Sequence, residues 1–205
     1  YEGEFEYPEG LRSKYAVLIY GPDVSGSPNV PTAIFDGSGV STAYGISSSN
    51  GVSLFVKDVK FQDYGVNGVN DEGAGLSLVN DCLLACDNVH TSNCYDGILC
   101  YRGRLYVSGG LFVVNPATAG QQANYSAIKA VFHCKHHIGY LYNRDTDSQS
   151  ADTLGNGPNI SPSDATTHSR GFFCKENCTG HVNGVVIDGL LRGVEMYASC
   201  RANIS

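Results

Sequence analysis

The chain has 205 residues, of which 42% are hydrophobic and only 16% are charged, and its formal net charge is −7. This length suits one domain or at most two, and a negative chain without a basic stripe is a poor partner for nucleic acid. No apolar run approaches the ~20 residues of a membrane-spanning helix, so we expect no membrane insertion.

The residue usage favours short strands joined by tight turns. There are 25 Gly and 13 Tyr but only one Met and no Trp. Gly, Ser, Asn and Asp suit turns, whereas Val and Tyr suit strands. Since no segment carries the apolar i, i+3, i+4, i+7 spacing of a helix, the sequence predicts an all-β protein with little helix.

The first 44 residues predict the entry to a repeated structure. Residues 15–20 (YAVLIY) form a short apolar strand that Gly21-Pro22 closes, since Pro cannot continue a ladder. A second strand follows at residues 32–36. The interval between them is too short for a full coil of three strands, so we expect two faces of one entry coil within residues 1–44.

A short sequence motif, called the repeated phrase below, occurs twice between residues 52 and 98, and the two copies are about 30 residues apart. Each copy has a strand-sized apolar triplet, a polar corner, and a Gly followed by an apolar residue. One coil cannot bury its apolar row alone, whereas stacked coils bury a continuous row. The copies are Val56-x-x-Val59-x-Phe61 with Gly65-Val66 and Cys86-x-x-Val89-x-Thr91 with Gly97-Ile98; later phrases begin at Ile128 and Val182.

These phrases predict one single-stranded, right-handed parallel β-helix over residues 1–205. Regular coils occupy residues 45–142, a long polar side loop occupies 143–170, and further coils occupy 171–205. A two-sheet sandwich is the alternative, but it needs hairpin turns, and dipeptides such as Asn50-Gly51 are few. Because the chain lacks an initiator Met, we expect it to be a fragment of a longer protein.

Eight cysteines raise the question of metal or disulfides. The triplets Cys82, Cys86, His90 and Cys174, Cys178, His181 have spacings that differ from the CxxC knuckles of zinc sites. Buried free thiols in the inner row of narrow coils are the interpretation that we favour. We therefore expect no metal site and no cofactor.

Several segments together resemble a known family. They are YPEG, the strand ending in Ile-Tyr-Gly, PTAIFDGSG, and the repeated V-x-x-V-x-F/I phrases that lead to G-V/I. They are similar to the pectate-lyase-like right-handed parallel β-helix, and within it to the body of a bacteriophage tailspike or capsule depolymerase. The resemblance covers most of residues 1–140 and 172–200.

This resemblance implies a homotrimer that binds bacterial surface polysaccharide, often with endoglycosidase or lyase activity. It also implies a place in the virion tail and assembly in the bacterial host cytoplasm, which suits reduced cysteines. Such spikes are usually longer, with a particle-binding domain before the β-helix and a trimerisation domain after it. The active residues of the family can therefore lie in parts that this chain lacks.

Aligning the phrases predicts rows of polar side chains on the outside of the coils. A hydrolase needs two carboxylates about 5–10 Å apart, and neighbouring coils are ~4.8 Å apart, so Asp63 and Asp96 are the best pair. Either Asp can instead simply shape its turn. One predicted row holds Tyr64, Asp96, His137 and Arg192; the position before it holds Asp63, Tyr95, His136 and Leu191.

A lyase acting on acidic sugars needs a base and a cation instead, and residues 135–144 hold both types. The base would be His137, His136 or Tyr140. Since adjacent strand residues point to opposite faces, at most one of the two histidines can face a groove. The cation would be Lys135 or Arg144.

Other polar and aromatic residues are candidates for sugar contacts, because Tyr offers a flat apolar face with a polar end. They can equally be ordinary surface residues, and His133 at an inward phrase position reads as a core histidine. Three functions remain open: a tailspike-like protein that binds and cleaves polysaccharide, a non-catalytic structural or receptor-binding part of a virion appendage, and a secreted bacterial polysaccharide lyase. The candidate sugar contacts are Tyr64, Tyr95, Tyr101, Arg102, Arg104, Lys135, Tyr140 and Arg144.

Overall fold

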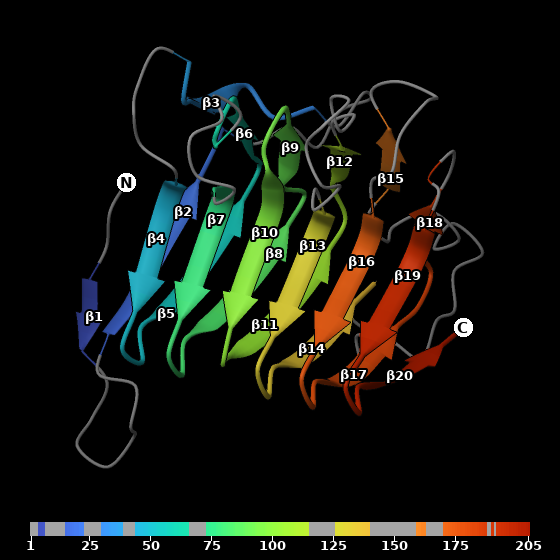
Figure 1. Cartoon of the computed structure of the whole chain (residues 1–205). Helices are drawn as coiled ribbons and strands as arrows, with labels where there is room; N and C mark the ends of the chain where they lie inside the picture. The colour runs from blue at the N-terminus through green and yellow to red at the C-terminus, as the bar shows by residue number, and fades with distance from the viewer. Residues whose placement is uncertain are drawn as a thin grey trace, which may run out of the picture.

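The computed structural model describes ten parts of the chain, which contain strands and no helix (Figure 1). Within them, no helix is long and apolar enough to cross a membrane. The described residues are 4–6, 15–22, 30–38, 44–65, 73–114, 126–139, 159–162, 170–187, 190 and 192–205.

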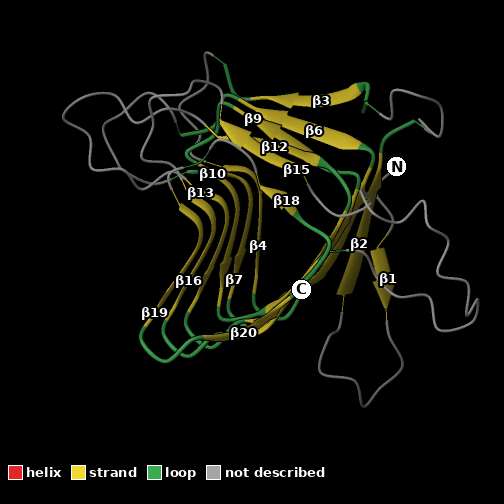
Figure 2. Cartoon of the chain, turned by 90° about the vertical axis from the view of Figure 1, so that its right-hand side faces the viewer, coloured by secondary structure: helices red, strands yellow, loops and turns green. Residues whose placement is uncertain are grey.

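The strands form three sheets around a common interior (Figure 2). Sheet A contains β1 (Glu4–Glu6), β2 (Tyr15–Tyr20), β5 (Ser53–Lys57), β8 (Leu83–Asp87), β11 (Arg104–Ser108), β14 (Lys135–Ile138), β17 (Thr179–Val182) and β20 (Arg201–Ile204). Sheet B contains β3 (Ala33–Asp36), β6 (Val59–Gln62), β9 (His90–Ser92), β12 (Leu111–Val114), β15 (Asn159–Pro162) and β18 (Val186–Ile187). Sheet C contains β4 (Tyr44–Ser49), β7 (Ala74–Val79), β10 (Asp96–Tyr101), β13 (Ser126–Val131), β16 (Arg170–Lys175) and β19 (Arg192–Tyr197).

Successive strands from β2 onward belong to sheets A, B and C in a repeating order. From β2 onward, every hydrogen-bonded neighbour of a strand lies three strands away in sequence, and these pairs are all parallel. Only β1 pairs antiparallel, on the edge of β2. The prediction of an all-β protein is confirmed. β2 and β3 belong to different sheets, as two faces of one entry coil would.

The repeated phrase also has a direct structural counterpart. Val56 of β5 pairs with Cys86 of β8, and Phe61 of β6 pairs with Thr91 of β9. The first half of the phrase is therefore confirmed as one strand of sheet A, a corner, and one strand of sheet B.

Two predictions about spacing are wrong. The sheet C partner of Ile98 is Leu76, not Val66, because the connection from β6 to β7 is much longer than that from β9 to β10. Ile128 likewise pairs with Ile98 in sheet C, so it does not start a phrase like that at Val56. A repeat of constant length in the sequence does not show where the connection between two strands is longer.

The predicted side loop at 143–170 is also wrong in part. Residues 159–162 form β15, which pairs with β12 in sheet B, and Arg170 begins β16. Residues 143–158 and 163–169 lie outside the described residues. A four-residue strand within a polar run carries too short an alternation to be recognised in sequence.

The core consists of inward-facing rows that continue from coil to coil. Alternation along each strand sends every second side chain inward, and the parallel register stacks these side chains on one another. The resulting rows are apolar and fully buried. They include Leu54, Leu84 and Leu105 from sheet A, Phe61 and Phe112 from sheet B, and Leu76, Ile98, Ile128 and Phe172 from sheet C.

Corners between sheets use left-handed backbone, and Asn and Asp tolerate it. Asp58 and Asn88 occupy successive corners between sheets A and B with φ of 55° and 49°, and the Asn88 amide donates to the Asp58 carboxylate at 2.7 Å. Asn93 donates in the same way to Asp63 one corner later. Side chains of one coil thus satisfy those of the next.

Cysteines close the corner between sheets C and A. The thiols of Cys82, Cys134 and Cys178 each donate to the carbonyl three residues earlier, over 3.2, 3.0 and 3.1 Å. Seven of the eight cysteines are buried, and all eight are free thiols. The expectation of buried free thiols is confirmed, and their repetition follows from the repeated corner.

Tight packing at the start of the sheet C strands can be tested with two matched glycines. A Cβ on Gly97 would lie 2.5 Å from the Ala127 carbonyl oxygen, whereas a Cβ on Gly193 would meet nothing closer than 3.6 Å. We expect Gly97→Ala to lower the free energy of unfolding by about 1–3 kcal/mol and Gly193→Ala to leave it nearly unchanged. Equal urea midpoints for the two variants would contradict this packing limit.

Candidate functional site

The outer face of sheet A carries a shallow hollow of about 460 Å³. Four neighbouring strands, β11, β14, β17 and β20, build it, so it spans four successive coils. Its lining is polar and cationic, with rings and amides. The lining residues are Tyr106, Lys135, His136, His137, Thr179, Gly180, His181, Arg201, Ala202 and Asn203.

Three rings form a row across the strands of this hollow. Tyr106 pairs in register with His137, and His137 pairs with His181. The ring centroids of Tyr106 and His137 are 6.5 Å apart with an interplanar angle of 21°, and those of His137 and His181 are 5.9 Å apart. Since the Tyr106 side chain is on the outward face and 36% exposed, the row lies at the protein surface.

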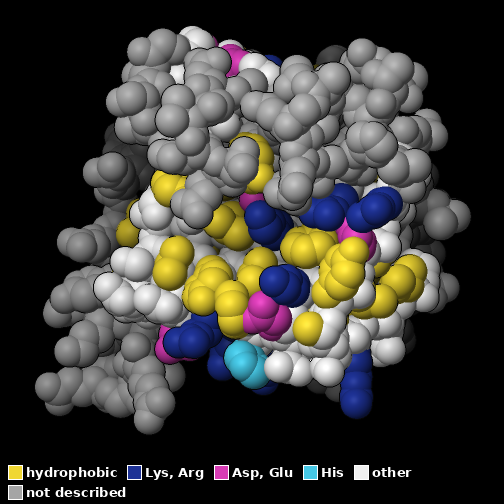
Figure 3. Space-filling model, in the orientation of Figure 1, with side chains coloured by type: hydrophobic (Ala, Val, Ile, Leu, Met, Phe, Trp, Pro, Cys, Tyr) yellow, Lys and Arg dark blue, Asp and Glu magenta, His cyan; other side chains and the backbone are white. Residues whose placement is uncertain are grey.

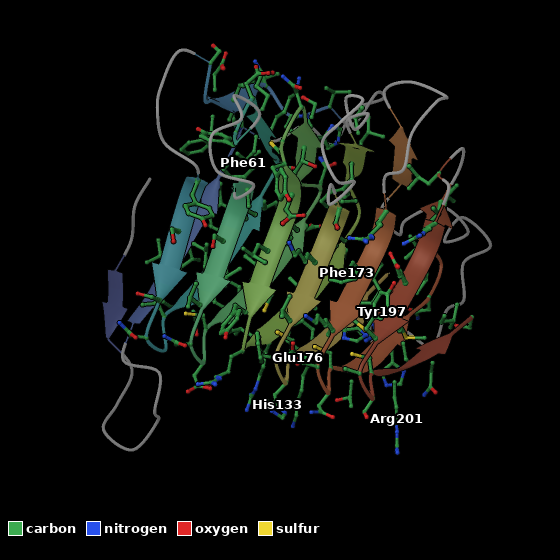
Figure 4. The ribbon with its side chains drawn as sticks, viewed as in Figure 1. Phe61, His133, Phe173, Glu176, Tyr197 and Arg201 are labelled. Atoms are coloured by element: carbon green, nitrogen blue, oxygen red, sulfur yellow. The ribbon has the colours of Figure 1, made fainter. Side chains whose placement is uncertain are left out.

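A second outward row, two residues earlier on each strand, is cationic. Arg104 pairs with Lys135, Lys135 with Thr179, and Thr179 with Arg201. All four residues are exposed. In Figure 4, Arg201 extends away from the ribbon at this end of the stack. Among the described residues, no Asp or Glu lines the hollow, so its described lining is positively charged on a chain whose net charge is −7.

His136 lies beneath this face and points into the core. It occupies the inward row between Leu105 and Gly180, its side chain is 3% exposed, and its ring packs 4.8 Å from that of Phe172. Neither ring nitrogen has a hydrogen-bond partner among the described residues, and burial, with His181 and His137 nearby, lowers the pKa of His136 to about 4. The prediction that only one of the paired histidines can face a groove is confirmed: it is His137.

Gly180 makes room for this buried imidazole. A Cβ at position 180 would lie 1.9 Å from the His136 carbonyl oxygen and 2.6 Å from Cδ2 of its ring. The glycine therefore lets a histidine replace the leucine that occupies this row in earlier coils.

The two predicted carboxylates, Asp63 and Asp96, each interact with a different neighbouring side chain. Asp63 accepts a hydrogen bond from Asn93 at a corner. Asp96 begins β10, is 1% exposed, and holds the Lys129 ammonium at 3.1 Å. Burial raises the pKa of Asp96 to about 6, against the opposing pull of Lys129. Both carboxylates therefore serve local structure, and neither lines the hollow.

The predicted row that joined Asp96 to His137 is wrong. Asp96 pairs with Ala74 and Ser126 in sheet C, whereas His137 pairs with Tyr106 in sheet A. The alignment of the repeated phrases places in one row two positions that belong to different sheets. Their side chains consequently project from different faces of the protein.

Two predicted sugar-binding tyrosines are buried. Tyr64 and Tyr95 are each 5% exposed. The Tyr64 ring fills the space where Gly37 and Gly45 lack a side chain, and Lys129 lies 5.8 Å above the Tyr95 ring. Neither ring offers a face to solvent, which contradicts the prediction that they form a platform for sugar.

The remaining predicted residues are dispersed. Tyr101 ends β10 in sheet C and packs 4.6 Å from the ring of Phe132, and Arg102 is exposed at a corner with φ of 55°. His133, expected in the core, is instead exposed at a corner (Figure 4). Tyr140 and Arg144 lie outside the described residues.

The hollow thus unites three of the predicted residues, Lys135, His136 and His137, with Arg104 beside them. Nothing in the sequence singles out Arg201, and the sequence does not place Tyr106 or His181 beside these residues. The two histidines whose rings lie side by side, His137 and His181, are 44 positions apart, because a long connection separates β14 from β15. Only the strand register reveals them as neighbours.

The described residues contain no group of three or more His, Cys, Asp or Glu side chains that could hold a metal ion. Comparison with known protein families, with curated proteins and with solved structures finds no match. The functional argument therefore rests on the fold and on this hollow.

The buried imidazole makes stability depend on pH. The pKa of His136 is about 4 in the folded chain against 6.5 ordinarily, so the unfolded chain binds this proton more readily. Stability is full above about pH 6.5 and falls as the pH drops toward 4, by about 2 kcal/mol between pH 7 and pH 5. We expect His136→Leu to remove this contribution, as urea denaturation at the two pH values would measure.

His133→Asn is the matched control, because it removes an exposed imidazole at a corner whose left-handed backbone suits Asn. The loss of stability at low pH should persist in this variant. If His136→Leu keeps the full loss, another group is responsible for it.

Proposed function

We propose that this chain is a right-handed parallel β-helix that binds polysaccharide through the hollow on sheet A. The proposed β-helix is supported by the parallel pairing of every third strand, which lets one strand of each sheet make up each coil. A right-handed crossover is the usual geometry between parallel strands. The row of Tyr106, His137 and His181 is the observation that carries the binding proposal.

Sugars bind where flat rings meet hydrogen-bonding groups. Aromatic side chains contact the apolar faces of sugar rings, while nearby amides and hydroxyls fix their orientation. Here the rings stand on neighbouring strands, ~4.8 Å apart in the stacking direction. Thr179 and Asn203 supply a hydroxyl and an amide beside the rings.

A bacterial surface polysaccharide is the proposed ligand, and a phage tail is the proposed location. The resemblance to tailspikes supports both, with assembly in the host cytoplasm and action at the host surface. Eight free cysteines are consistent with assembly in a reducing compartment. A non-catalytic receptor-binding role fits the hollow without any further assumption.

Polysaccharide cleavage is a second candidate, and elimination is the chemistry that the hollow favours. Lys135 and His137 lie together there, a cation for a sugar carboxylate and an imidazole that can accept a proton. A hydrolase has less support, since Asp63 and Asp96 are separately engaged. The alternative to a phage protein is a polysaccharide lyase that a bacterium secretes.

Binding can be tested with Tyr106→Ala against a panel of bacterial capsules and lipopolysaccharides. We expect loss of about fivefold or more in affinity, because stacking on an exposed ring contributes roughly 1 kcal/mol or more. Tyr20→Ala is the control, since Tyr20 is 52% exposed on the same sheet, three strands from Tyr106. Equal affinity of wild type and Tyr106→Ala for every bound glycan would rule out this site.

The same panel separates binding from cleavage. Elimination would shorten the chains and create unsaturated sugars that absorb ultraviolet light, and His137→Gln should abolish both signals. Hydrolysis would shorten the chains without that absorbance. Binding with neither signal would leave the receptor-binding role and discard the enzyme.

A homotrimer is also proposed, on the resemblance to tailspikes. Sedimentation equilibrium of this chain should then give a mass about three times the monomer mass of 21.8 kDa. A strict monomer at every concentration would remove self-association within these residues from the proposal.

A further inference from the structure

We propose that the hollow selects an acidic polysaccharide, which lies across the strands with its anionic groups on Lys135 and Arg201. The inference rests on the proposed function, sugar binding at this site, and adds the class of sugar and its direction. Carboxylate and sulfate groups share the required chemistry. Four observations support the inference. They are the ion pairs that cations form elsewhere on the protein, the row of cations without a described acidic partner, the spacing of that row, and the ring row beside it.

Five of the ten Lys and Arg residues in the described part of the chain form an ion pair with a neighbouring carboxylate. Sheet C illustrates this, with acidic and basic side chains interspersed on its outer face (Figure 3). Its Lys129 pairs with Asp96, and its Arg192 with Glu195 at 2.6 Å. The other ion pairs are Lys57–Asp87, Arg170–Glu195 and Lys175–Glu176.

The outward row on sheet A differs, since three cations without a described acidic partner are aligned there, whereas Lys60 on sheet B and Arg102 at a corner lack one singly. Arg104, Lys135 and Arg201 form no salt bridge with any described carboxylate, although all three are exposed in one row. Like charges repel when they are aligned on neighbouring strands. An anionic ligand would relieve this repulsion, whereas a neutral one would leave it.

The spacing of the row suits a linear ligand. Arg104 and Lys135 are on adjacent strands, and Arg201 is two strands beyond Lys135. With ~4.8 Å between strands, the intervals are about 5 and 10 Å along the stack. The ring row runs in the same direction, so a sugar chain lying along the stack contacts rings and cations together.

Nucleic acid fits this surface less well. Its binding depends on many phosphate contacts at once, whereas this row offers three cations on a chain of net charge −7. An acidic polysaccharide offers apolar ring faces for Tyr106 in addition to its charges.

The experiment uses two matched pairs of glycans and one oligonucleotide. The first pair is polygalacturonate and its carboxyl-reduced form, the second is dextran sulfate and dextran, and the oligonucleotide is single-stranded oligothymidylate. Affinities are measured by biolayer interferometry at about 50 mM and about 200 mM salt, because charge-dependent binding weakens with salt. The pair that shows the larger preference identifies carboxylate or sulfate.

We expect at least one acidic glycan to bind about tenfold more tightly than its neutral partner, and less tightly at the higher salt. The double variant Lys135→Gln/Arg201→Gln should lose about tenfold in affinity for that glycan, since each exposed charge contact contributes only modestly. Lys175→Gln, which removes an exposed cation on sheet C, should bind like wild type.

Several results would overturn the inference. If neutral glycans bind as tightly as acidic ones through Tyr106, sugar binding stands and the selection for charge falls. If oligothymidylate binds as tightly as the acidic glycan, the site is a general polyanion surface and the inference also falls. If none of the four glycans binds, the inference falls, while binding in the wider panel through Tyr106 would still support the proposed function.

Discussion

The described structure depends on the parallel register between neighbouring strands of each sheet. Hydrogen bonds between a strand and its neighbours three positions away fix which side chains stack. Rows such as Leu54, Leu84 and Leu105 then become continuous and water-free, which no single coil could achieve. The same register aligns the outward rows, so the scaffold and its outer surface follow from one constraint.

The corners maintain this register by linking side chains between coils. Asn88 donates to Asp58 one coil earlier, and both adopt left-handed backbone that ordinary residues avoid. The cysteines at the next corner cap its carbonyls with weak thiol donors while filling a narrow space. Repetition of these residue types in the sequence therefore reflects repetition of corners, and it carries no catalytic meaning.

The candidate site departs from the pattern of the scaffold. His136 replaces a leucine in an inward row, and Gly180 accommodates it at the cost of a buried imidazole without a hydrogen bond. Directly outside lie His137, His181 and an unpaired cationic row. The buried imidazole destabilises the fold locally, and rings and charges are concentrated directly outside it. Functional sites often combine a local loss of stability with such a cluster of side chains.

The sequence by itself determined the all-β class, the repeated strand–corner–strand phrase and the burial of the cysteines, because alternation and turn residues are local properties. It also singled out Lys135 and His137. Only the tertiary structure decided which residues are neighbours. Insertions of unequal length between strands shift the period, so Asp96 and His137 fall on different sheets, while His137 and His181 meet across 44 positions. The side of the sheet on which a residue lies depends on strand register, and that register is fixed by pairing between distant coils.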